Sequence, residues 1–164
     1  MALNQLLTLI ENTPVGTAVR ESTWLFPTIE TLHVLSITLV VGTIMIVDFR
    51  LINVASRRRA VSELMSEVLP WTWTAFVCAV ITGSLLFSSA AVKYAHSAVF
   101  EFKMLMLVLA GINMTVFHLG TYRSVARWDR DVLTPRGARI SAALSLCIWV
   151  TVVSLGRWIG FTTN

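Results

Sequence analysis

Four long runs of apolar residues, separated by short polar segments, form the main pattern of the chain. They cover approximately residues 24–48, 69–91, 99–121 and 139–161. Each run can cross a hydrocarbon core of about 30 Å, which takes about 20 helical residues. Because backbone hydrogen bonds must be satisfied internally in lipid, we expect helices despite the many Val, Ile and Thr residues. The pattern predicts an all-α fold, an integral membrane four-helix bundle that forms a single membrane domain over residues 1–164.

Two shorter stretches repeat their apolar residues with the period of an amphipathic helix. The first covers residues 2–11, and its apolar positions are Leu3, Leu6, Leu7 and Ile10. The second ends before Pro70, and its apolar positions are Val61, Leu64, Met65 and Val68. We therefore expect two short interfacial helices, the first on the outer leaflet and the second on the cytoplasmic side.

The composition agrees with a protein of the membrane. The mean hydropathy is +0.73, and 55% of the residues are hydrophobic while 13% are charged. A soluble domain of this size cannot bury so much apolar surface and still present a polar exterior. The formal net charge of +4 does not indicate nucleic-acid binding, because the basic residues cluster between the apolar runs.

The arginines predict the orientation of the chain. The first and third connections hold most of them: Arg50, Arg57, Arg58, Arg59, Arg123, Arg127, Arg130, Arg136 and Arg139. The opposite side and its margins hold fewer basic residues: Arg20, Lys93, Lys103 and Arg157. By the positive-inside rule, both Arg-rich connections are expected in the cytoplasm and both termini outside.

Ionisable residues in the outer half of the bundle are the candidate functional residues. Glu30 and His33 lie one turn apart on the same face of the first run. Taking Asp48 as the inner edge, His33 lies roughly 22 Å outward and Glu30 roughly 27 Å. Other ionisable side chains reach a similar level in the remaining segments: His96, Glu101, Lys103 and Arg157. We expect these residues to converge on one outer-side site.

An ionisable group inside a span is costly and suggests a function. Imidazole and carboxylate suit copper, zinc or iron, so His33, Glu30 and His96 are candidate metal ligands. Lysine and arginine suit haem propionates, so Lys103 and Arg157 are candidate contacts of a b-type haem bound by His33. The alternative is an ion pair between Glu30 and one of these cations, with His33 as a hydrogen-bonded core histidine.

His118 offers another imidazole, but at a different depth. It lies about 15 Å below His33 by helical rise, so the two are not expected to bind one haem iron from opposite sides. Met106 lies at a depth that matches His33 and is a geometrically possible second axial ligand. His118 remains a candidate metal ligand in the inner half, where Cys78 and Cys147 come near its level.

Several stretches resemble an uncharacterised family of four-helix bacterial inner-membrane proteins. They are "ETLHVLS", "GTIMIVDFRLI", "LPWTWTAF", "TGSLLF", "FEFKMLMLVLAGIN" and "FH", and the similarity spans roughly residues 24–160. The resemblance implies a multi-pass protein of the bacterial inner membrane and implies no activity. In that membrane, the outer side on which the positive-inside rule places both termini is the periplasm. More loosely, the chain resembles copper-resistance D-type membrane proteins and four-helix b-type cytochromes. It departs from the four-histidine, two-haem pattern of the latter, having only His33, His96 and His118.

Two functions remain open from the sequence. The first is a redox or metal-handling membrane protein that binds copper or haem b and exchanges metal or electrons with a periplasmic carrier. The second is a cofactor-free oligomeric scaffold or channel with internal ion pairs. In that case Gly156 and Gly160 of "GRWIG" would place small residues at a contact between copies. The sequence lacks the motifs of a hydrolase.

Overall fold

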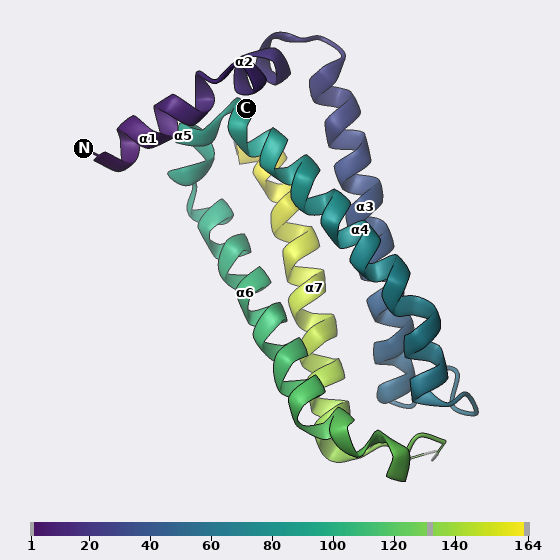
Figure 1. The fold of residues 1–164 in the computed structure, drawn as a ribbon. Helices are drawn as coiled ribbons and strands as arrows, with labels where there is room; N and C mark the ends of the chain where they lie inside the picture. The colour runs from purple at the N-terminus through teal and green to yellow at the C-terminus, as the bar shows by residue number, and fades with distance from the viewer. Residues whose placement is uncertain (1, 131–132, 163–164) are drawn as a thin grey trace.

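The computed structural model describes residues 2–130 and 133–162, which are helical over most of their length and form no strand. The elements in chain order are α1 (Ala2–Glu11), α2 (Pro14–Glu21), α3 (Leu25–Leu51), α4 (Val61–Ser89), α5 (Ala91–Ala95), α6 (Ala98–Leu119), the 3₁₀ helix η1 (Thr121–Arg127) and α7 (Arg136–Thr162). Figure 1 shows the four long helices side by side as a bundle. The predicted all-α bundle is confirmed.

The long helices α3, α4, α6 and α7 are each long and apolar enough to cross a membrane. They contain the four predicted runs with shifts of a few residues at most boundaries. The largest shift is at the start of α4, which begins at Val61 and continues through Pro70. The chain is therefore a multi-pass membrane protein.

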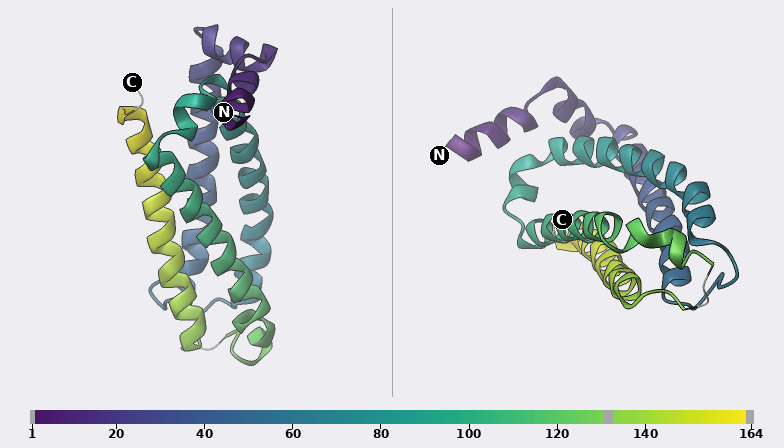
Figure 2. Two further views of the ribbon diagram at one scale, coloured as in Figure 1. Left: turned by 90° about the vertical axis from the view of Figure 1, so that its left-hand side faces the viewer. Right: turned by 60° about the horizontal axis from the view of Figure 1, so that its bottom comes forward.

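The long helices pack as two antiparallel pairs, α3 with α4 and α6 with α7, and α3 also packs on α7 (Figures 1 and 2). The short helices α1, α2 and α5 lie across one end of the bundle, where α1 contacts α5 and α2 contacts α4. We call this end the α5 end. The opposite end, which carries the two arginine-rich connections, is the Arg-rich end.

The helix predicted over residues 2–11 is present as α1. Leu7 is buried, whereas Leu3 and Leu6 are 66% and 58% exposed. The exposed leucines leave an apolar surface at the α5 end, as an interfacial helix requires.

The separate interfacial helix predicted over residues 61–68 is wrong. These residues are the first turns of α4, and Val61 and Met65 are buried in the core of the Arg-rich end against Leu51, Phe117 and Trp128. The amphipathic period of these residues does predict a helix, but the apolar face of that helix packs against protein rather than lipid. Pro70 does not end the helix.

A polar network holds the Arg-rich end together. Ala60 precedes α4, and its methyl side chain cannot accept a hydrogen bond from the first turn of the helix. The Asp129 carboxylate performs this role from a distance, accepting bonds from the Ser62 backbone N–H at 2.7 Å and the Ser62 hydroxyl at 2.6 Å. The Arg50 guanidinium, fully buried, donates to the carbonyls of Arg59 and Asp129 at 2.8 and 3.3 Å. These bonds join the two arginine-rich connections.

Candidate functional site

His33 on α3 packs directly against α4. Its Nδ1 lies 2.9 Å from the Thr82 Oγ1. A methyl group at Gly83 would come within 2.9 Å of His33 Cε1, so only glycine leaves room for the ring at this position. The imidazole is thus fixed by a hydrogen bond on one side and by close contact with the backbone of α4 on the other.

The polar surroundings of His33 come from α4. The Thr82 hydroxyl lies 2.7 Å from the Cys78 carbonyl and 2.9 Å from Nδ1 of the ring. When this hydroxyl donates to the carbonyl, it accepts from Nδ1, and the ring then carries its proton there. The Ala79 carbonyl also bonds to the ring. A histidine held in this way through its other ring nitrogen is typical of metal ligands.

Lys103 on α6 brings a positive charge to the same level of the bundle. Its ammonium is close enough to act electrostatically on His33. It also lies beside Gly156 on α7, where a methyl group would be 3.9 Å from Nζ. Within the described residues, Lys103 forms no ion pair. All four long helices thus contribute to one group, the His33 site, made of His33, Thr82, Gly83, Lys103 and Gly156.

The level of the His33 site follows from helical rise. His33 lies about 12 Å from the start of α3, and Lys103 about 8 Å from the start of α6. Gly83 and Gly156 lie about 9 Å from the ends of α4 and α7. The site is therefore roughly two turns below the α5 end of the bundle.

An aromatic cluster lies between the His33 site and the α5 end. Phe87 of α4 stacks on Phe100 of α6 with ring centroids 5.5 Å apart, and Tyr94 of α5 lies 5.8 Å from Phe100. Burial, followed by the negative charge of Glu30, raises the pKa of the Tyr94 phenol. Glu30 is exposed but close enough for its charge to act on Tyr94 of α5, and among the described residues it makes no ion pair with Lys103 or Arg157.

The other predicted site residues make no hydrogen bond or ion pair with His33 in the described part of the chain. Arg157 is exposed, and its guanidinium lies 5.0 Å from the centre of the Phe161 ring. His96 is exposed at the end of α5, with Nδ1 bonded to the Val92 carbonyl at 2.8 Å. Met106 is half-buried one turn beyond Lys103, so these two share a face of α6.

His118 belongs to the Arg-rich end. Its Nδ1 lies 2.9 Å from the Met114 carbonyl, and its ring packs against Phe117 and Tyr122. It lies 15 residues beyond Lys103 on the same helix, or about 22 Å. Residues 2–130 and 133–162 contain no group of three or more His, Cys, Asp or Glu residues arranged to hold a metal ion.

Asp48 is a buried polar residue that sequence reasoning missed. It was interpreted as the inner edge of the first span, but α3 continues to Leu51 and Asp48 is only 5% exposed. The Ser145 side chain on α7 hydrogen-bonds to it, while Oδ2 has no partner in the described part of the chain. Burial of such a group requires the contact between α3 and α7, which hydropathy along one helix does not reveal.

Thr82 was also missed as a site residue. Threonines occur throughout the apolar runs and usually bond to their own helix, as Thr74 does with the Pro70 carbonyl. The local signal at Thr82 is the glycine that follows it, because Gly83 admits a large side chain beside the hydroxyl. His33 could be paired with this position only after α3 and α4 were placed side by side.

The comparisons with known proteins identify a family and no activity. A family described as "Family of unknown function (DUF6644)" matches residues 15–162, so the chain belongs to that family. No curated protein and no solved structure matches the chain.

Proposed function

We propose that this family member is a b-type haem protein of the membrane, in which His33 would hold the iron. One observation carries the proposal: the hydrogen bond between Nδ1 and Thr82 orients the imidazole of His33 between α3 and α4, as the second ring nitrogen of a metal-binding histidine is usually held. A bound haem would supply one-electron chemistry at its iron. The looser resemblance to four-helix b-type cytochromes is consistent with this assignment.

Lys103 favours haem over a copper ion. Its ammonium would repel a bare cation near His33 but attract the carboxylate of a haem propionate. Met106 lies one turn away on the same face of α6 and is our candidate for a second residue that would hold the iron. Arg157 remains a candidate for the second propionate.

We further propose that a haem held here would pass single electrons between a reduced and an oxidised periplasmic carrier, both of which would bind at the α5 end. This places the α5 end and both termini in the periplasm and the Arg-rich end in the cytoplasm of a bacterial inner membrane. Most residues of α6 are exposed, so the faces of this helix that do not contact α7 are available to lipid or to another copy. Gly160 of α7, which has open space around it, is our candidate for a contact in a homo-oligomer.

The test is haem binding by the full chain, purified in detergent and titrated with ferric haem. We expect the wild type to develop the Soret band of a histidine-ligated haem, and His33→Ala to lose it. His96→Ala and His118→Ala are the matched controls, because each removes an imidazole that lies elsewhere in the fold.

Two results would overturn the proposal. A wild type that binds no haem would contradict it and favour the copper or scaffold alternative, which a parallel copper titration separates. Loss of haem in His118→Ala to the same extent as in His33→Ala would contradict the position of the site.

A further inference from the structure

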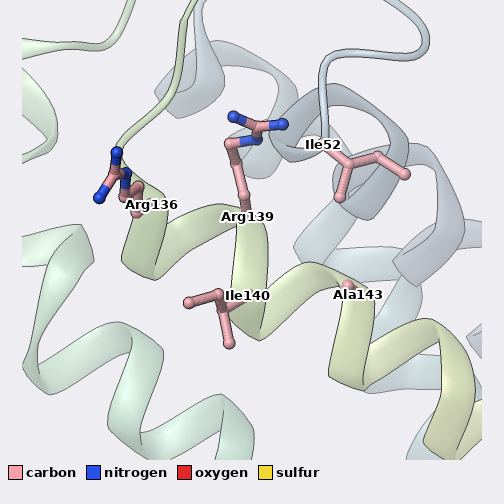
Figure 3. Close-up of a pocket in the computed structure, with 5 residues that line it drawn as sticks. All are labelled: Ile52, Arg136, Arg139, Ile140 and Ala143. Atoms are coloured by element: carbon pink, nitrogen blue, oxygen red, sulfur yellow. The ribbon is translucent and has the colours of Figure 1, made fainter.

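A basic groove with an apolar wall lies at the Arg-rich end, between the end of α3 and the start of α7 (Figure 3). It is about 520 Å³ in volume and is lined by Ile52, Arg136, Arg139, Ile140 and Ala143. Arg136 and Arg139 are three residues apart in the first turn of α7, so both guanidinium groups leave the same side of the helix. We propose that this groove binds one anionic phospholipid.

Within residues 2–130 and 133–162, no ion pair offsets the charge of the groove. Arg136 and Arg139 are exposed and pair with no carboxylate of these residues. The acidic side chains described at the Arg-rich end have other partners. Glu63 and Glu67 lie 3.8 and 2.6 Å from Arg59, the Asp129 carboxylate is bonded to Ser62, and the buried Asp48 is bonded to Ser145. The two guanidinium groups supply donors of the kind that a phosphate diester accepts.

The apolar wall distinguishes a lipid from a soluble phosphate. Ile140 is 61% exposed, and Ala143 is also exposed about 4.5 Å further along α7, inside the apolar span. The groove therefore presents positive charge at one end and apolar side chains at the other. This order matches the charged headgroup and the acyl chains of a phospholipid at the boundary of a bilayer. Basic sites between helices at this depth are typical of anionic headgroup recognition.

The test is the affinity of the full chain in detergent for phosphatidylglycerol, measured by native mass spectrometry. The double variant Arg136→Gln/Arg139→Gln removes both guanidinium groups from exposed positions. Each arginine near a membrane surface strengthens binding about fivefold, so we expect about 30-fold weaker binding. The matched control is Arg58→Gln/Arg127→Gln, which removes two exposed arginines outside the groove and should change little because distant charges are screened.

A second pair of variants tests the apolar wall without changing charge. Ala143→Phe fills the groove and should weaken binding of phosphatidylglycerol, whereas Leu144→Phe, on a neighbouring exposed position, should not. Inorganic phosphate in excess should fail to displace the lipid. Equal weakening by both arginine pairs would contradict the proposal by showing a general effect of surface charge. Unchanged binding by Ala143→Phe, or displacement by inorganic phosphate, would contradict a lipid and indicate a soluble anion.

Discussion

His33 and Thr82 are joined by a hydrogen bond of 2.9 Å between Nδ1 and Oγ1, which links α3 to α4 inside the span. The Thr82 hydroxyl also lies 2.7 Å from the Cys78 carbonyl of its own helix, so the imidazole is oriented by α4. An imidazole held through one ring nitrogen can bind a metal through the other.

The first prediction concerns Thr82→Val, which keeps the shape of the side chain and removes the acceptor for Nδ1–H. Loss of such a partner typically weakens metal binding about 10- to 100-fold. We expect that decrease in haem affinity, measured by the Soret titration, with the helical content unchanged.

Thr74→Val is the control for this change, because Thr74 is an exposed threonine of the same helix that bonds to the Pro70 carbonyl. It should bind haem as the wild type does. Equal affinity in Thr82→Val and Thr74→Val would show that the hydroxyl does not support the ligand.

The second prediction concerns Gly83→Ala. The added methyl group would lie 2.9 Å from His33 Cε1, so the ring must move and its bond to Thr82 must stretch. We expect loss of haem binding in the same titration. Gly42→Ala is the control, since nothing lies within 4 Å of a methyl group there. Retention of full haem binding by Gly83→Ala would contradict the close fit of the imidazole.

The third prediction concerns the charge of Lys103. Lys103→Met keeps a long flexible side chain and should weaken haem binding about 10- to 100-fold, the effect of losing a hydrogen bond to a charged group. It should also lower the midpoint potential of the haem, because a nearby positive charge favours the reduced iron. Lys93→Met, at an exposed position, is the control. An unchanged midpoint potential in Lys103→Met would show that Lys103 does not lie near the haem.

The fourth prediction concerns stability and pH at the Arg-rich end. Desolvation opposes ionisation of Asp129, but the bonds from Ser62 and Val61 and the charge of Arg130 outweigh it and lower the pKa of the carboxyl below 3.8. A lowered pKa stabilises the folded protein above the unfolded pKa, and this stability is lost as the pH falls through the folded value. Asp129→Asn keeps one acceptor oxygen and removes the charge, so it should cost about 0.3–1 kcal/mol near neutral pH, the usual value of a negative charge at a helix N-terminus.

Thermal unfolding of the detergent-solubilised protein between neutral pH and about pH 3 tests this prediction. The difference between wild type and Asp129→Asn should shrink toward the acid end. Glu21→Gln, which removes an exposed carboxylate, should show no such difference. A difference that stays constant with pH would show that the charge of Asp129 is not involved.

The architecture could be predicted from the sequence because a lipid environment permits few backbone structures. An apolar run of about 20 residues can only be a helix that satisfies its own backbone, so the four spans followed from hydropathy alone. Hydropathy alone also led to the wrong prediction for residues 61–68, which were expected to form a separate interfacial helix. Its period shows which face is apolar, but only the contact of Val61 and Met65 with Phe117 and Trp128 shows what covers that face.

The candidate site could be predicted only in part. The depth of His33 and Lys103 follows from helical rise, and the structure places the Lys103 charge close enough to act on the imidazole of His33. Their neighbours Thr82 and Gly83 depend on how α3 and α4 are rotated against each other, which the period of either helix leaves undetermined. The same is true of Glu30, which shares a face with His33 but acts electrostatically on Tyr94 instead of Lys103.

Rescue of His33→Gly by free imidazole tests most directly whether His33 binds the haem iron. This variant removes the ring and leaves space for a soluble imidazole to take its place at the iron. We predict that His33→Gly shows little Soret absorption after titration with haem, and that added imidazole restores the wild-type spectrum. A spectrum that equals that of the wild type without imidazole, or one that imidazole does not restore while the variant stays folded, would contradict ligation by His33.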